Sequence, residues 1–173
     1  MSDSYAVRRL TSVSDRDAQG LALVLIDCVD GGASVGFMHP LSMETALAFW
    51  RRVGREVEKG ARALLIAEDA AGIVGTVQIV LEQPENQPHR ADLSKMLVHR
   101  RAWRRGIGAA LMRAAEDAAR HLRKSLLVLD TASGDAERLY ARMGWTLVGV
   151  IPDYAFWPKG GFCGTSLFYR KLD

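Results

Sequence analysis

The sequence predicts a single α/β domain in which helices flank a central, twisted, mixed β-sheet. Three observations support this fold class. The chain has 173 residues, which suits one domain spanning residues 1–173. Its composition, with 49% hydrophobic and 25% charged residues, is typical of a globular protein that can bury a sizeable core. In the second half, segments with strand and helix patterns alternate, which favours a mixed sheet with a β–α–β crossover near its centre.

The first half of the chain predicts two amphipathic helices and three strands. The first helix begins at a capping box, in which Ser14 is followed three residues later by Asp17. The second helix has an apolar stripe and ends before Gly60. Two apolar runs on either side of an Ala-Ala-Gly turn predict a β-hairpin. In chain order we expect a strand at residues 5–10, helices at residues 14–31 and 43–59, and strands at residues 62–68 and 73–81.

The second half predicts four more strands and two helices. Pro84 and Pro88 mark the preceding segment as a loop. An Ala-rich run then predicts a long helix, and a shorter helix ends before Gly144. We expect strands at residues 92–98, 126–130, 146–151 and 166–172, and helices at residues 106–122 and 135–143.

The most informative segment is the basic loop between the expected strand at 92–98 and the helix that follows it. Four arginines lie within six residues of this loop, and without them acidic residues would outnumber basic ones. Gly106 and Gly108 fall in the first helical turn, where unpaired N–H groups and the helix dipole favour an anion. Glycines let a phosphate approach the backbone, and arginines add charge-assisted hydrogen bonds. The segment therefore predicts a diphosphate-binding site.

Two common nucleotide motifs do not fit this segment. The chain has no GK[ST], which excludes a Walker loop, and Leu111 occupies the position of the third glycine in GxGxxG. The hexapeptide that begins at Trp103, WRRGIG, instead resembles the [QR]xxGxG pyrophosphate loop of the GNAT superfamily of N-acetyltransferases, with Trp in place of Gln or Arg. Residues 137–145, in which Tyr140 precedes a glycine and an aromatic residue, resemble a second motif of that family. The resemblance covers most of the chain and implies a GNAT-like fold.

The same resemblance implies acetyl-CoA as the cosubstrate. The end of the expected strand at 92–98 would pair its backbone with the pantetheine arm and polarise the acetyl carbonyl through an N–H group. Residues 104–109 would hold the pyrophosphate. The expected cofactor-binding residues are Met96, Leu97, Val98, Trp103, Arg104, Arg105, Gly106, Ile107, Gly108 and Ala109.

Three residues are candidate catalytic groups. The resemblance places Asp92 where the family has a Glu that acts as general base, and the shorter Asp would act through a water molecule. The alternative is that Asp92 is a surface residue at the start of a strand. Asp130 ends a strand and is either the base, the group that holds the substrate ammonium, or a cap for the next helix. The Tyr140 phenol would protonate the departing CoA thiolate, or the residue is structural.

Strand alternation adds a geometric expectation for the first of these groups. Side chains two residues apart lie on the same face of a regular strand. The residues expected on one face are Asp92, Ser94, Met96 and Val98.

Other reactive motifs receive a structural interpretation. Residues 32–36 match GxSxG, but a helix precedes them and no helix follows directly, which excludes a hydrolase nucleophile elbow. We expect this loop to form a mobile wall of the acceptor pocket.

The four histidines are scattered and the cysteines form no CxxC, so no metal site or disulfide is expected. Cys28 is expected in the core, and Cys163 has no histidine near it in sequence, so we expect direct transfer through a ternary complex.

The predicted function is transfer of an acetyl group from acetyl-CoA to a primary amine. Residues 31–38 and 129–131 resemble the tabtoxin-resistance members of the family, which implies a small amino-acid-like toxin or antibiotic as the acceptor. Polyamines and protein N-termini or lysines are alternatives, since the acceptor depends on loops 31–40, 83–90 and 152–165. A rival hypothesis is a regulatory domain that binds acyl-CoA without catalysis.

The sequence also limits the partners. No aromatic platform or second basic face accompanies the arginines, so nucleic acid is not an expected partner. No window approaches the roughly 18 apolar residues of a membrane span, and the N-terminus lacks a signal-peptide pattern, so we expect no membrane partner and a cytoplasmic location. The oligomeric state stays open, although a homodimer is common in the family.

Overall fold

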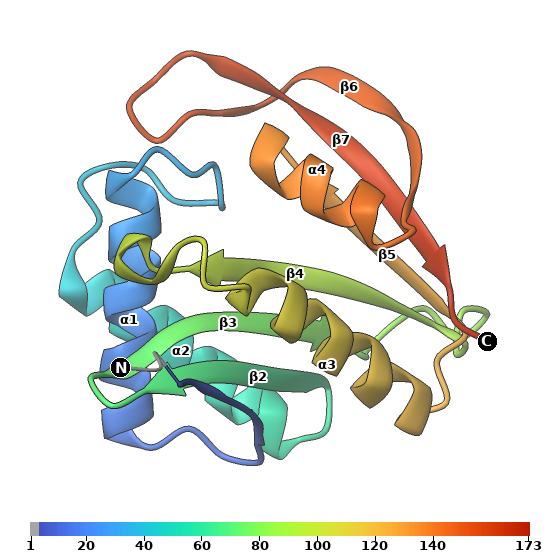
Figure 1. Ribbon diagram of the computed structural model, residues 1–173, viewed down its shortest axis with the longest axis horizontal. Coiled ribbons are helices and arrows are strands. Elements are labelled where there is room, and N and C mark those ends of the chain that lie inside the picture. The colour runs from blue at the N-terminus through green and yellow to red at the C-terminus, as the bar shows by residue number, and fades with distance from the viewer. Residues whose placement is uncertain (1–3) are drawn as a thin grey trace.

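The chain folds around one mixed sheet of seven strands in the order β1-β2-β3-β4-β5-β7-β6 (Figure 1). The computed structural model describes residues 4–173, so the first three residues of the expected domain, Asp3 included, lie outside the described residues. Neighbouring strands are antiparallel except β4 and β5, which are parallel and joined by α3. In chain order the elements are β1 (Ala6–Leu10), α1 (Asp15–Asp30), α2 (Met43–Glu58), β2 (Arg62–Asp69), β3 (Gly72–Val80), β4 (Arg90–Val98), the 3-10 helix η1 (Arg100–Ala102), α3 (Ile107–His121), β5 (Leu126–Thr131), α4 (Gly134–Arg142), β6 (Thr146–Phe156) and β7 (Phe162–Lys171).

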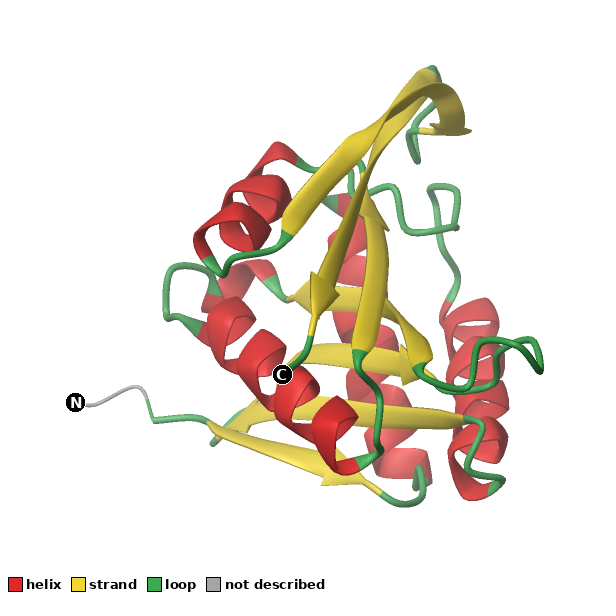
Figure 2. Cartoon of the chain, turned by 90° about the vertical axis from the view of Figure 1, so that its right-hand side faces the viewer, coloured by secondary structure: helices red, strands yellow, loops and turns green. Residues whose placement is uncertain are grey.

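Helices lie on both faces of the sheet (Figure 2), and a hydrophobic core fills each face, one under α1 and α2 and the other under α3 and α4. Alternation along β2 divides its side chains, so that Leu64 and Ile66 pack with α1 and α2 while Leu65 faces α3. The fully buried Trp50 of α2 belongs to the first core, and Tyr140 of α4 belongs to the second. The predicted α/β fold with a central mixed sheet is therefore confirmed.

The C-terminal hairpin differs from the expectation. β6 and β7 extend well into residues 152–165, which the sequence predicts as a loop. Pro152 is tolerated because β6 is the edge strand, where one missing backbone donor breaks no inner ladder. A register shift between Ile151 and Ala155, with Asp153 at φ 52, absorbs the irregular residues.

A bulge in β4 changes which side chains share a face. Opposite β3, Gln78 pairs with Ser94 and Thr76 pairs with Leu97, so β4 has one extra residue in this interval. Lys95 lies there with φ 51, a left-handed conformation that few L-residues adopt.

The bulge makes the expected common face of Asp92, Ser94, Met96 and Val98 wrong. Leu93 and Leu97, four residues apart, enter opposite cores, whereas an unbroken strand would place them on the same face. Met96 and Val98 pack against the core on the α3 side. At the start of β4 the odd-numbered Leu93 therefore faces that core, whereas at its end the even-numbered Met96 and Val98 do.

Among the described residues, no helix is both long and apolar enough to cross a membrane.

Candidate active site

A cleft opens where β4 and β5 separate. The two strands pair only between Arg90–Asp92 and Leu126–Val128, and Figure 1 shows them diverging beyond this point. The cleft has a volume of about 1420 Å³ and is lined by both strands, the start of α3, α4 and the loop that contains Ser34. From Leu93 to Val98 the edge of β4 that faces β5 has no strand partner among residues 4–173, so an extended ligand can pair with its backbone.

The N-terminus of α3 lies at this cleft without a side-chain cap. The other three described α-helices begin at serine caps, Ser14, Ser42 and Ser133, each accepting a backbone hydrogen bond. The N-cap of α3 is Gly106, at φ 76, and it makes no such bond. The first intrahelical bond reaches the N–H of Ala110, which leaves the preceding N–H groups of α3 for a ligand. Their partial positive charge fits a diphosphate.

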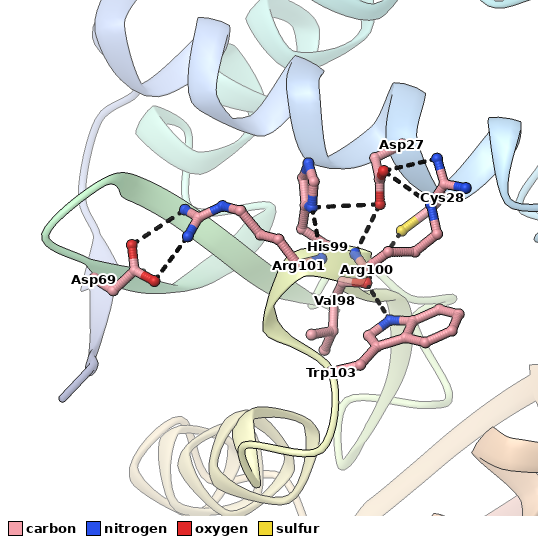
Figure 3. Close-up of polar contacts among 8 residues, drawn as sticks. All are labelled: Asp27, Cys28, Asp69, Val98, His99, Arg100, Arg101 and Trp103. Carbon is pink, nitrogen blue, oxygen red and sulfur yellow. Dashed lines mark hydrogen bonds and ion pairs between the residues drawn. The ribbon is translucent and has the colours of Figure 1, made fainter. Parts of the chain in front are cut away.

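Carboxylates hold three of the four loop arginines, and Figure 3 draws two of them, Arg100 and Arg101. Arg100 contacts Asp27 through its backbone N–H, at 2.8 Å, and through its guanidinium, at 2.9 Å. Arg101 and Arg105 both contact Asp69, at 2.9 and 2.8 Å. These two guanidinium groups hold the pKa of the Asp69 carboxyl well below its usual range. The ion pairs tie the loop to α1 and to the β2–β3 hairpin.

The arginines therefore differ in what they can offer a phosphate. The side chain of Arg105 is turned toward Asp69 and does not line the cleft, so a contact from Arg105 to the cofactor would have to come from its backbone. Arg104 lines the cleft and makes no ion pair with any residue in the range 4–173. Its φ of 61 turns the backbone just before Gly106. Arg104 is therefore the best placed of the four to contact an anion.

Trp103, which replaces the family's Gln or Arg, has a structural partner. Its indole Nε1 donates a hydrogen bond to the Val98 carbonyl at 2.9 Å, while 57% of the residue stays exposed at the cleft (Figure 3). The thiol of Cys28 donates to the same carbonyl, with Sγ at 3.6 Å. Cys28 is buried, as expected from the sequence, and burial raises its pKa to about 12, which disfavours the reactive thiolate.

Asp92 lines the cleft but already has partners. It accepts a hydrogen bond from Gln83 Nε2 at 3.1 Å and pairs with the guanidinium of Arg90. Its side chain is 42% exposed. Both carboxylate oxygens of Asp92 are therefore already hydrogen-bonded within the protein.

Asp130 and Tyr140 line the same cleft from β5 and α4. Asp130 accepts a hydrogen bond from Thr165 Oγ1 at 2.9 Å. It does not cap the next helix, because Ser133 has that role. Tyr140 is 4% exposed and packs against the rings of Trp145 and Phe168, yet it lines the cleft. Burial and the charge of Asp130 raise the pKa of Tyr140, so the phenol stays protonated and can donate a proton or hydrogen bond.

The GxSxG loop lines the cleft, whereas its mobility and its contact with an acceptor remain predictions. Ser34 Oγ donates to the Phe156 carbonyl at 3.0 Å and accepts from Cys163 Sγ at 3.4 Å. A backbone bond from His39 N–H to the Pro158 carbonyl, at 2.9 Å, adds a second link to the β6–β7 hairpin. Within residues 4–173 no group of three or more His, Cys, Asp or Glu side chains is arranged to hold a metal ion.

The family model described as "Acetyltransferase (GNAT) family" matches residues 32–145, well over half of the chain. The protein belongs to the GNAT acetyltransferase family. The matched range contains the Ser34 loop, β4, the start of α3, β5 and α4, which all line the cleft.

Solved structures agree with this fold. A presumed acetyltransferase from Salmonella typhimurium, solved with its cofactor acetyl-CoA, superposes with a TM-score of 0.77 at 18% identity, over 98% of this chain and 94% of that one. A ribosomal-protein-alanine N-acetyltransferase from Brucella melitensis gives 0.80 at 20% identity, over 96% and 99%. A presumed phosphinothricin N-acetyltransferase gives 0.76 at 17% identity, over 98% and 99%. At these identities the likeness establishes the fold alone.

Sequence reasoning missed three residues of this GNAT site. Asp27 and Asp69 hold the arginine loop from positions far away in the chain, and no local pattern marks them. Lys95 lines the cleft from the β4 bulge. A lysine inside a strand near the centre of the sheet was the available signal, because burying its ammonium is costly without a purpose.

Proposed function

We propose that this GNAT protein transfers the acetyl group of acetyl-CoA to the primary amine of a small molecule. The observation that carries the proposal is the cleft between the diverging strands β4 and β5, which has the uncapped N-terminus of α3 on its border. Acetyl-CoA, when bound, supplies an activated thioester. Its diphosphate and its extended pantetheine arm match the two features of this cleft.

The binding roles follow from the available backbone groups. The N–H groups at Ile107, Gly108 and Ala109 would bind the diphosphate, and Arg104 would add its charge. The free edge of β4 at Met96–Val98 would pair with the pantetheine amides. A backbone N–H on this edge is suited to stabilise negative charge that develops on the thioester oxygen.

The catalytic roles fall on opposite sides of the reacting centre. An amine with a pKa of about 10 must lose a proton before it attacks. Asp130 is our preferred carboxylate for this step, directly or through water, because Arg90 and Gln83 already occupy Asp92. Tyr140, kept protonated by its surroundings, would donate to the sulfur of the leaving group. No covalent intermediate on the protein is required.

An amino-acid-like toxin or antibiotic is the acceptor class we favour. The short sequence likeness to tabtoxin-resistance proteins supports it, and a structural neighbour is called a phosphinothricin N-acetyltransferase. We also propose a cytoplasmic location, since Cys28 and Cys163 are both free and acetyl-CoA is an intracellular metabolite.

Calorimetry with CoA, combined with a thiol-release assay over a panel of amines, tests the proposal. We expect saturable CoA binding that weakens with salt, and release of the thiol that depends on both acetyl-CoA and an amine. Binding without turnover on any amine would favour a regulatory acyl-CoA-binding domain. Absence of CoA binding at any salt concentration would refute the proposed function.

A further inference from the structure

A second cavity adjoins the cleft, with which it shares three lining residues. Its volume is about 460 Å³, and it lies between α2 and the loop around Phe37. Lys95 lines both this cavity and the main cleft, as do Val35 and Gly36. A ligand that reaches Lys95 from the cleft can therefore extend into the second cavity.

Two cations line this cavity around one aromatic ring. The Lys95 Nζ lies 5.8 Å from the ring centroid of Phe49, and the Arg52 Cζ lies 5.4 Å from the same centroid. Among the described residues that line the cavity there is no carboxylate. Neither cation forms an ion pair or a side-chain hydrogen bond with any residue between 4 and 173.

Two arginines and one carboxylate act on the ammonium of Lys95. Burial, followed by the nearby charges of Arg62 and Arg52, lowers the pKa of Lys95, whereas Asp130 acts in the opposite direction. A partly buried ammonium that faces other cations is a costly arrangement for a protein alone. An anion between Lys95 and Arg52 would remove that cost, because each cation could form a charge-assisted hydrogen bond with it.

We propose that this cavity is an anion subsite that binds the carboxylate of the acceptor, so that the substrate is a free amino acid or an amino-acid-like compound. The inference rests on the proposed function and narrows it. Lys95 and Asp130 both line the main cleft, so one site can hold both ends of a short amino acid: the amine would lie beside Asp130 and the carboxylate beside Lys95.

The other acceptor classes fit less well. A polyamine would bring a second ammonium toward Lys95 and Arg52, which repel it. The N-terminus of a polypeptide carries an amide where a free amino acid carries its carboxylate, so it cannot neutralise the pair.

Matched acceptors test the subsite directly. Thiol release would be measured with a panel of free L-amino acids and with the carboxamide of each, both sets at saturating acetyl-CoA. In parallel, thermal stabilisation of the CoA-saturated protein by each compound reports binding without turnover. We expect the carboxylates to be preferred in kcat/KM by roughly tenfold to a hundredfold, as is typical of a hydrogen bond to a charged group.

Variants locate the preference on the two cations. Arg52→Gln and Lys95→Met should each reduce the preference for carboxylate over carboxamide, and Lys95→Arg should restore part of it. Arg51→Gln is the matched control, because Arg51 is next to Arg52 on α2 but pairs with Asp15 at 3.2 Å and does not line the cavity. The Arg51→Gln variant should prefer carboxylate over carboxamide as strongly as the unmodified protein does.

The outcomes separate this inference from the proposed function. Equal turnover and stabilisation by carboxylates and carboxamides, or none by either set, overturns the anion subsite. So does a carboxylate preference that survives both Arg52→Gln and Lys95→Met. If turnover on carboxamides or polyamines persists, the acetyltransferase function stands without the subsite; if CoA itself does not bind, the function fails.

Discussion

The indole of Trp103 donates its hydrogen bond to the Val98 carbonyl, five residues earlier in the chain, and so ties the end of β4 to the loop that precedes α3. In the GNAT pattern this position carries Gln or Arg, whose side chain can reach a phosphate. Here the side chain is bound to the protein's own backbone. Diphosphate binding in this protein should therefore depend chiefly on the N–H groups of α3 and on Arg104.

Gly108→Val should raise the KM for acetyl-CoA at least tenfold. A side chain in the first turn of α3 would block the approach of a phosphate to the backbone. Because a Cβ at Gly108 would also meet Leu139 at 3.2 Å, the variant needs a control for packing. Gly20→Val is that control: its Cβ would meet Ile73 at 3.1 Å, on a helix away from the cleft. If both variants give the same KM, the phosphate site lies elsewhere.

Asp130→Asn should lower kcat/KM for the amine about a hundredfold, as expected for loss of a general base. Asp92→Asn removes a partly exposed ion pair with Arg90, so its effect should stay within about fivefold. Steady-state kinetics with acetyl-CoA saturating will rank the two. A larger loss from Asp92→Asn would return the base to Asp92, and an increase confined to the amine KM would make Asp130 a substrate anchor.

Tyr140→Phe should lower kcat about a hundredfold with little change in either KM, because a proton donor acts in the transition state. The fold should survive, since the substitution keeps the ring that packs against Trp145 and Phe168. Tyr169→Phe, outside the cleft, is the matched control. Burial raises the pKa of Tyr140 above the ordinary value of about 10, so kcat should show no loss from tyrosine ionisation below that pH. Comparable losses in binding and rate would show a structural role.

Cys163→Ser should retain most activity. Cys163 is buried, and its thiol donates to Ser34 at 3.4 Å instead of contacting a histidine that could activate it. Double-reciprocal plots of the unmodified enzyme should converge, as a ternary complex requires. Parallel lines together with a labelled acetyl group trapped on Cys163 would establish a covalent relay instead.

Local chemistry explains what the sequence could predict. The capping box forms as expected, with Asp17 N–H donating to Ser14 Oγ at 3.1 Å, because both partners lie in one turn. The uncapped start of α3 is predictable for the same reason, because Gly106 and Gly108 lie within one turn. The short helix that carries Tyr140 has its own local sequence pattern, so its presence was predictable, and Tyr140 lines the cleft.

Features that depend on distant partners were not predictable. The β4 bulge at Lys95 exists only in the register between β3 and β4, so strand alternation misplaced Met96 and Val98. Asp69 binds Arg105 from 36 residues away, which redirects an arginine that looks free in the sequence. Such contacts arise from tertiary structure and leave no periodic signal.

A structure of the protein with CoA tests the central claim most directly. We predict the diphosphate within hydrogen-bonding distance of the N–H groups of Ile107, Gly108 and Ala109, and the pantetheine arm along the free edge of β4 beyond Asp92, with its sulfur directed toward Tyr140. CoA bound outside the cleft between β4 and β5, or with its diphosphate away from the start of α3, would contradict this account.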